Sequence, residues 1–252
     1  MRFTKMQGLG NDYLYFCGAV PPEVRDLCRR LCDRHFGPGA DGLIYIGPSD
    51  RADFSMRIFN ADGSEAEMCG NGIRCVGKYV YDRGLTEKTD LAIETRAGLR
   101  RLSLHLAEGK VAAVTVDMGR ARVEPRAQGG CAVNLGNPHL VLFVPKAEAA
   151  PVAARGAALC QSVPGGVNVE FVQVLNQTTL RMRVWERGSG VTLACGTGAC
   201  AAAAAAVYKG LCKQGIPIEV RLDGGSLEIT VDDRGEVRMT GPAVTVYEGE
   251  LP

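Results

Sequence analysis

Residues 69–72 read Cys-Gly-Asn-Gly, and residues 195–198 read Cys-Gly-Thr-Gly. The second motif follows the first by 126 residues (195 − 69 = 126), which is half of the 252-residue chain. Other segments match at the same offset: residues 9–11 with 135–137, 38–39 with 164–165, and 56–60 with 182–186. Colinear matches at one offset indicate an internal repeat, so we expect two homologous halves that share one fold.

The composition is that of an ordinary globular protein. Hydrophobic residues make up 46% of the chain and charged residues 23%, which excludes a disordered chain. A formal net charge of +1 leaves no basic excess for binding nucleic acid. No apolar run reaches the roughly 18–20 residues that cross a membrane, and the first residues lack the apolar core of a signal peptide. We therefore expect a cytoplasmic protein with reduced cysteines that binds neither nucleic acid nor a membrane.

The two halves are predicted to contain similar elements in the same order. Apolar runs predict strands over residues 13–17, 43–46 and 54–59, and over residues 140–144, 169–174 and 180–185 in the second half. A first helix is expected over residues 22–36. Another is expected over residues 199–208, which are nearly all alanine. Because such a helix has no polar face, we expect a sheet to wrap around it.

Each Cys-Gly-x-Gly motif is predicted to place its cysteine at a helix N-terminus. Unpaired N–H groups and the positive end of the helix dipole lower the pKa of a thiol there from about 8.5 to roughly 3.5–7.5. The same N–H groups can bind a carboxylate. Two such half-sites that face each other would present one sulfur to each face of an α-carbon. Cys69 and Cys195 are therefore candidates for an acid–base pair that inverts a stereocentre without a cofactor or metal.

Longer motifs resemble the diaminopimelate epimerase family. They are Asn-Ala-Asp-Gly-Ser at 60–64 with Cys-Gly-Asn-Gly-Ile-Arg-Cys at 69–75, and Glu-Arg-Gly at 186–188 with Ala-Cys-Gly-Thr-Gly-Ala-Cys at 194–200. Gly-Asn-Asp at 10–12 and Gly-Asn-Pro-His at 136–139 also resemble the family. The resemblance implies an α+β fold of two pseudo-symmetric domains, each a mixed β-barrel wrapped around a central helix. We expect the domains at residues 1–118 and 119–241, with a C-terminal strand at about 242–252 that returns to the first domain.

The resemblance also implies a function and a site. It implies a homodimeric isomerase that interconverts LL-diaminopimelate and meso-diaminopimelate in lysine and peptidoglycan precursor biosynthesis, without pyridoxal phosphate or metal. Cys69 would be the proton donor and Cys195 the proton acceptor, and Tyr247 would contact the second subunit. His139 and Glu186 would support the acid–base pair. The substrate-binding residues that it implies are Asn11, Asn60, Gly70, Asn71, Asn137, Asn168, Glu186, Arg187, Gly196 and Thr197.

One position departs from part of that family. Some members carry a pocket Gln where this chain has Gly42, the repeat mate of Asn168, so only the backbone of Gly42 could contribute.

Other interpretations stay open. A related racemase of another amino acid would also use two thiols, although the proline racemase motif usually has His in place of Asn71. A cysteine hydrolase or acyl transferase would use Cys195 as nucleophile and His139 as base, and would leave Cys69 idle. A non-catalytic member of the same fold would bind a small acid and would not need paired thiols.

Overall fold

The chain divides into two compact units. The computed structural model describes residues 1–126 and 130–251. Unit 1 contains Met1–Val116 and Gly241–Pro252, and unit 2 contains Asp117–Thr240. Strands β8 (Lys110–Arg120) and β17 (Glu236–Pro242) each extend across one of these divisions of the sequence. Over the described residues, no helix is both long enough and apolar enough to cross a membrane.

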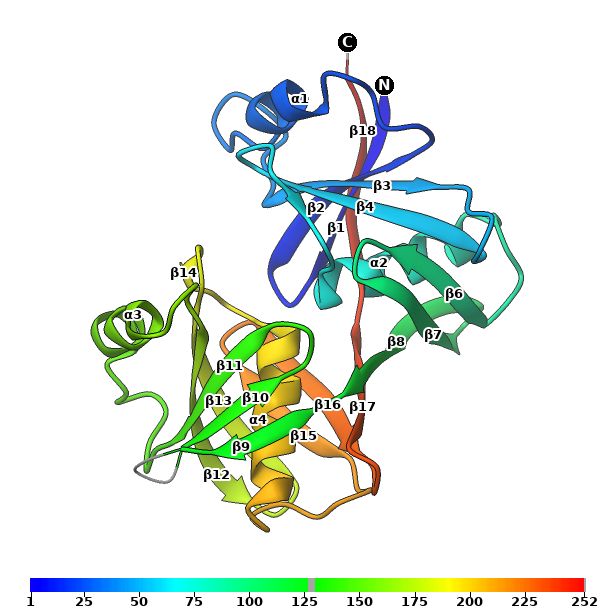
Figure 1. The fold of residues 1–252 in the computed structure, drawn as a ribbon. Helices are drawn as coiled ribbons and strands as arrows, with labels where there is room; N and C mark the ends of the chain where they lie inside the picture. Colours follow the sequence, from blue (N-terminus) through cyan, green and yellow to red (C-terminus); the bar gives the residue numbers. More distant parts are fainter. Residues whose placement is uncertain (127–129, 252) are drawn as a thin grey trace. The chain divides into compact units, whose positions relative to one another are not determined.

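Unit 1 combines a mixed sheet with two helices (Figure 1). The strands pair in the order β18–β1–β2–β3–β4–β6–β7–β8, and β5 also pairs with β4. Helix α2 (Gly70–Asp82) packs against β1, β2 and β7, while α1 (Val24–Leu31) lies in an apolar cluster with β2, β3 and β4. The strands not yet bounded are β1 (Arg2–Gly8), β2 (Asn11–Cys17), β3 (Gly42–Gly47), β4 (Phe54–Asn60), β5 (Glu65–Ala66), β6 (Asp90–Thr95), β7 (Gly98–Ala107) and β18 (Val244–Glu250).

Unit 2 repeats this arrangement around helix α4 (Gly196–Tyr208). The strands pair in the order β9–β10–β11–β12–β13–β15–β16–β17, and β14 pairs with β13. Helix α3 (Val152–Ser162) packs against β12, β13 and β14. The remaining strands are β9 (Arg122–Pro125), β10 (Cys131–Asn134), β11 (Pro138–Phe143), β12 (Asn168–Asn176), β13 (Thr179–Glu186), β14 (Gly190–Val191), β15 (Ile218–Leu222) and β16 (Gly225–Val231).

The internal repeat extends to individual residue pairs of the two sheets. In the parallel pairing of β2 with β3, Tyr13 lies opposite Gly42. In the parallel pairing of β11 with β12, His139 lies opposite Asn168, and both residues are displaced by 126 (139 − 13 and 168 − 42). Helices α2 and α4 each have 13 residues and begin 126 residues apart (196 − 70 = 126). The prediction of an α+β fold built from a repeat is therefore confirmed.

The alanine-rich helix α4 is enclosed by strands, as its composition predicts. It packs against β9, β10, β11, β12, β13, β15 and β16 (Figure 1). Seven consecutive alanine and cysteine side chains, at positions 199–205, are at most 3% exposed. Alanine is the best helix former and has only a methyl group, so the surrounding strands can approach the helix backbone closely.

The first helix is shorter than predicted. We expected it to span residues 22–36, but α1 ends at Leu31 with Cys32 as its C-cap. The Asp33 carboxylate accepts hydrogen bonds from the backbone N–H groups of His35 (2.7 Å) and Phe36 (2.9 Å). This local turn competes with helical hydrogen bonding and ends the helix before Gly37.

Replacing a buried alanine of α4 is expected to destabilise the protein. Ala202 is 0% exposed, so Ala202→Leu should lower the free energy of unfolding by about 1–3 kcal/mol through overpacking. Urea unfolding followed by circular dichroism measures the change. Ala158→Leu, on the exposed side of α3, is the control and should have little effect. Equal effects of the two substitutions would show that α4 is not tightly enclosed.

Candidate active site

The first half-site is built on the N-terminus of α2. Cys69 is the N-cap residue, with an extended backbone (φ −135°, ψ 119°). Its Sγ accepts a hydrogen bond from the backbone N–H of Gly72 at 3.4 Å. The sulfur therefore takes the place that a Ser or Asp oxygen occupies in an ordinary helix cap. This position directs the thiol and the N–H groups of the first turn to the same end of the helix.

Asn11 and Asn71 surround this thiol. Cys69 Sγ donates to Asn11 Oδ1 at 3.4 Å, and Asn71 Nδ2 lies 3.5 Å from the same oxygen. Asn11 Nδ2 donates to Asp41 Oδ2 at 2.7 Å. The buried Arg74 holds Asn71 from behind, donating to Asn71 Oδ1 at 3.0 Å and to the Gly70 carbonyl at 3.1 Å. The first unit thus brings together four of the predicted residues: Asn11, Cys69, Gly70 and Asn71.

The second half-site has the same cap. Cys195 is the N-cap of α4 (φ −117°, ψ 111°), and its Sγ accepts from the Gly198 N–H at 3.3 Å. The Thr197 hydroxyl lies 3.6 Å from the sulfur. Asn137 Nδ2 donates to Thr197 Oγ1 at 3.4 Å. Because that hydroxyl accepts from Asn137, its own hydrogen is available to the sulfur.

A buried pair of titratable side chains, His139 and Glu170, lies behind the second half-site. His139 Nδ1 is 2.6 Å from Glu170 Oε1, and both side chains are fully buried. His139 Nε2 is 3.1 Å from Asn137 Oδ1, which can only accept, so Nε2 carries a hydrogen. The short bond from Nδ1 to Glu170 needs a second hydrogen, on the imidazole or on the carboxyl group. Each of these two buried groups therefore has the other as a hydrogen-bond partner.

The electrostatics of Cys195 differ from our prediction. We expected the helix N-terminus to lower the pKa of this thiol. Instead, burial and then the negative charges of Glu186 and Glu170 raise its pKa well above the ordinary value, and the bonds from Thr197 and Gly198 only partly oppose them. Burial destabilises the thiolate by more free energy than the hydrogen bonds of the cap stabilise it. Within its own unit, the surroundings of Cys195 therefore favour the thiol over the thiolate, and a thiolate formed there is a strong base.

The remaining predicted residues of unit 2 are Asn168 at the start of β12, Glu186 at the end of β13 and Arg187 directly after it. Asn168 Oδ1 accepts from the backbone N–H of Arg187 at 2.8 Å. The exposed Arg187 guanidinium donates to the Gly165 carbonyl at 3.0 Å. Glu186 accepts a hydrogen bond from the Thr192 hydroxyl, and its charge acts on Cys195. Of these residues, Glu186 acts on the Cys195 thiol, and Asn168 lies opposite His139 in the pairing of β11 with β12.

Asn60 and Gly42 form the equivalent part of unit 1. They lie opposite each other in the pairing of β3 with β4, and Asn60 Nδ2 donates to Ser64 Oγ at 3.0 Å. A Cβ atom on Gly42 would lie 2.2 Å from the Phe59 carbonyl oxygen and 2.9 Å from the Tyr13 ring. The local backbone therefore leaves no room for a side chain at position 42.

Tyr247 is placed apart from these groups. It lies on β18, donates from its hydroxyl to the Pro38 carbonyl at 3.2 Å, and packs edge-on against Phe3. Neither contact involves a predicted substrate-binding residue. The contact with a second subunit stays a prediction.

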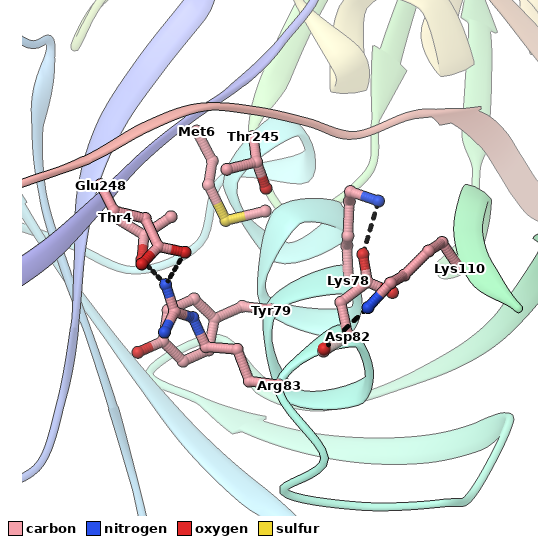
Figure 2. Close-up of a pocket in the computed structure, with 9 residues that line it drawn as sticks. All are labelled: Thr4, Met6, Lys78, Tyr79, Asp82, Arg83, Lys110, Thr245 and Glu248. Atoms are coloured by element: carbon pink, nitrogen blue, oxygen red, sulfur yellow. Dashed lines mark hydrogen bonds and ion pairs between the residues drawn. The ribbon is translucent and has the colours of Figure 1, made fainter.

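A cavity in unit 1 is not the candidate site (Figure 2). It has a volume of about 200 Å³ and lies beside the C-terminal part of α2. Its charges pair with one another: Arg83 with Glu248 at 2.6 Å, and Lys78 with Asp82 at 2.7 Å. Its lining residues include none of the predicted site residues; they are Thr4, Met6, Lys78, Tyr79, Asp82, Arg83, Lys110, Thr245 and Glu248.

Glu170 lies beside the second half-site but belongs to none of the sequence motifs. The residue lies in the apolar run Val-Glu-Phe at 169–171, and its repeat mate is Ile44 (170 − 44 = 126). A carboxylate in a predicted buried strand is unusual, because burying an unpaired charge is costly. That break in the pattern was the available signal, but its partner His139 lies 31 residues away in the sequence and becomes its neighbour only in the sheet.

Comparison with solved structures defines the class of protein to which this fold belongs. A probable proline racemase from Agrobacterium radiobacter matches with a TM-score of 0.78 and 19% identity, covering 100% of this chain and 92% of that one. At that identity the likeness shows a shared fold alone. The fold is the diaminopimelate epimerase-like fold, in which a repeat of strands and a central helix occurs twice.

Sequence comparison then identifies the family. The family model described as diaminopimelate epimerase matches residues 3–124 and 131–246. The chain is 47% identical to the diaminopimelate epimerase of Acetivibrio thermocellus over 277 aligned residues, covering 100% of this chain and 98% of the relative. It is 49% identical to that of Bacteroides thetaiotaomicron, with the same coverage. The chain belongs to the diaminopimelate epimerase family, whose members are isomerases of lysine biosynthesis.

Removing the charge of Glu186 should make Cys195 easier to ionise. Since Glu186 is the largest charge that raises the pKa of this thiol, Glu186→Gln should move the pH midpoint of Cys195 alkylation downward. Iodoacetamide labelling over a pH series, read by peptide mass spectrometry, measures the midpoint. Glu219→Gln, at an exposed carboxylate of the same unit, is the control. An unchanged or higher midpoint in Glu186→Gln would contradict this account.

Proposed function

We propose that this chain interconverts LL-diaminopimelate and meso-diaminopimelate by a two-thiol acid–base mechanism. Family membership and full-length relatives of that name support the reaction. The observation that carries the mechanism is the repeated cap, in which Cys69 and Cys195 each hold the N-terminal position of a helix. One cysteine, as the thiolate, removes the α-proton from one face, and the other, as the thiol, delivers a proton to the opposite face. The reaction inverts the centre and is balanced, because one proton leaves and one arrives.

The helix N-termini would bind the carboxylate of the reacting centre. The candidate donors are the backbone N–H groups of Gly70, Asn71, Gly196 and Thr197, which lie in the first turns of α2 and α4. When the α-proton leaves, negative charge develops on the carboxylate oxygens. Fixed N–H donors and helix dipoles stabilise that charge without reorganising. This role requires neither a metal nor a cofactor.

The side chains around each thiol support opposite roles for the two cysteines. Asn11 Oδ1 accepts from Cys69, which suits a thiol that holds a proton to donate. Both sulfurs accept a backbone N–H, but the side chain beside Cys195 is the Thr197 hydroxyl, which can donate to a sulfur that takes up negative charge. We therefore assign Cys69 as proton donor and Cys195 as proton acceptor in the direction from the LL form.

His139 and Glu186 would support Cys195. A series of hydrogen bonds runs from Glu170 to His139, then to Asn137 and to Thr197, which lies beside the Cys195 sulfur. Glu186 acts on the thiol through its charge.

The contacts of His139 argue against the cysteine hydrolase alternative. Both ring nitrogens of His139 already have partners, so neither is directed at Cys195 as the base of a nucleophile.

The distal end of the substrate would be recognised by Asn60, Asn168, Glu186 and Arg187. Glu186 is the repeat mate of Asn60 (186 − 60 = 126), so the two halves differ in charge at this position. Such a difference suits a ligand with one end that is inverted and another that is only recognised. The exposed Arg187 guanidinium can bind a second carboxylate through two parallel hydrogen bonds.

The family also supports a setting for the activity. We propose a cytoplasmic homodimer, with Tyr247 at the contact between subunits. Its exposed neighbours on β18, Val244 and Val246, would provide apolar area for such a contact.

Removing either proposed acid–base thiol should stop turnover. Cys69→Ala and Cys195→Ala should each lower kcat by at least about 10²–10⁴-fold, the usual contribution of a positioned acid or base. The assay follows the epimerisation of LL-diaminopimelate in D₂O, with loss of one α-proton signal by NMR. Each variant should retain its far-ultraviolet circular dichroism spectrum.

The same two helices supply the matched controls. Cys75 and Cys200 are buried within α2 and α4 but do not cap them. Cys75→Ala and Cys200→Ala should therefore keep turnover and lose only stability. Near-wild-type activity in Cys69→Ala or Cys195→Ala would refute the two-thiol mechanism.

Replacing the guanidinium of Arg187 by an ammonium group should weaken recognition of the distal carboxylate. Arg187→Lys should lower kcat/KM for diaminopimelate by the equivalent of about 1.5–3 kcal/mol, the value of a hydrogen bond to a charged group. Wild-type enzyme should use lysine, which lacks that carboxylate, poorly. Arg221→Lys, at an exposed arginine of β15, is the control. Comparable kcat/KM for lysine, proline and diaminopimelate would instead indicate a general amino-acid racemase.

A further inference from the structure

Two repeat-related asparagines, Asn11 and Asn137, present opposite ends of their side-chain amides to the two half-sites. They occupy equivalent positions (137 − 11 = 126). Asn11 directs its carbonyl oxygen toward Cys69 and its amide toward Asp41. Asn137 directs its amide toward Thr197, while its oxygen accepts from His139. Since both residues are asparagine, the neighbouring groups must determine the orientation of each side-chain amide.

In unit 1 the charged neighbour that fixes the Asn11 amide is Asp41. An ionised carboxylate has no hydrogen to donate, so only the amide nitrogen of Asn11 can face it. Asp41 is itself fixed: its Oδ2 accepts from Asn11 Nδ2 at 2.7 Å and from the Asp12 backbone N–H at 3.1 Å, and its Oδ1 accepts from Arg34 at 2.8 Å. The repeat mate of Asp41 is Val167 (167 − 41 = 126), so unit 2 has no such acceptor.

We propose that Asp41 is a positioning residue that locks the Asn11 amide so that its carbonyl oxygen accepts the thiol hydrogen of Cys69. The lock makes Cys69 the proton-holding member of the pair, and its effect on turnover rests on the proposed function. Without it, the Asn11 amide can rotate and present its NH₂ group to the sulfur, which favours the thiolate. No substrate contact by Asp41 is involved.

The other titratable groups near Cys69 carry no charge that would fix the Asn11 amide. The Tyr13 hydroxyl is hydrogen-bonded with both Cys69 and Asn11, but a neutral phenol can donate or accept and so permits either orientation. Tyr13 and Tyr15 on β2 and Cys75 on α2 each interact with Cys69, and burial raises the pKa of all three. These groups are therefore neutral at neutral pH and contribute no charge to the choice. The Arg74 guanidinium orients Asn71, whose Nδ2 lies 3.5 Å from Asn11 Oδ1. That contact favours the same orientation of Asn11, but it is longer than the 2.7 Å bond to the Asp41 carboxylate.

Alkylation of Cys69 across a pH series tests the lock. In Asp41→Asn the new amide can accept from or donate to Asn11, so the orientation is released. The pH midpoint of Cys69 alkylation should fall, and the rate at neutral pH should rise by about fivefold, the effect of exchanging one ordinary hydrogen bond. A change in access alone would scale the rate at every pH and leave the midpoint in place. Cys195, read in the same digests, should not change.

Asp12→Asn is the matched control for charge. Asp12 belongs to the same cluster and binds Lys5 at 2.9 Å and Arg34 at 2.7 Å, but its carboxylate makes no hydrogen bond with the Asn11 side chain in the described structure. The Asp12→Asn variant removes the same charge as Asp41→Asn and should leave the pH midpoint of Cys69 alkylation unchanged. An equal shift in Asp12→Asn and Asp41→Asn would overturn the lock in favour of a simple charge effect, and an unchanged midpoint in Asp41→Asn would overturn it outright.

A swapped pair provides a second variant. In the double variant Asn11→Asp with Asp41→Asn, residue 41 can donate and residue 11 again presents only oxygen to Cys69. Its alkylation at neutral pH should be slower than in Asp41→Asn, and an equal or faster rate would contradict the proposal. Each variant is first checked by circular dichroism. Because alkylation requires no turnover, failure of this test leaves the two-thiol reaction to be judged by its own assay.

Discussion

The site depends on one interaction, the hydrogen bond from a backbone N–H of a helix's first turn to a cysteine sulfur. In unit 1 the donor is Gly72, at 3.4 Å from Cys69, and in unit 2 it is Gly198, at 3.3 Å from Cys195. The bond needs a small residue at the third helical position. A Cβ on Gly72 would lie 2.7 Å from Ile44, and one on Gly198 would lie 2.9 Å from Glu170. The glycines of the motif therefore let a strand side chain pack directly below each cap.

What lies below each cap makes the two half-sites different. Ile44 and Glu170 are repeat mates, and so are Tyr13 and His139. Unit 1 thus places an aliphatic side chain and a phenol where unit 2 places a carboxyl group and an imidazole. Burial raises the pKa of Glu170, and the contact with His139 opposes that shift. An acid–base pair that treats two faces of one carbon differently requires this kind of inequality.

Much of the fold follows from local rules. Ten of the thirteen residues of α4 are buried, and all of those are Gly, Ala or Cys. Their small side chains allow the strands to enclose the helix. The hairpin of β7 and β8 turns at Glu108 and Gly109, both with positive φ (51° and 75°). In contrast, α1 is shorter than its apolar periodicity predicts, because the Asp33 side chain forms a competing turn. Propensity predicted that a helix exists there, and a single side chain determined where it ends.

The sequence by itself determined the repeat, the position of both cap cysteines and the family, because a periodic motif and its glycines need no partner to be recognised. Tertiary structure alone decided the protonation chemistry around them. The pKa of Cys195 is raised, against our expectation from a helix N-terminus, because burial and two carboxylates outweigh the cap bonds. Asp41 faces Asn11, and Glu170 faces His139, across 30 and 31 residues of sequence. Hydrogen-bond polarity depends on which groups the sheet brings within about 3 Å, and no local pattern records that.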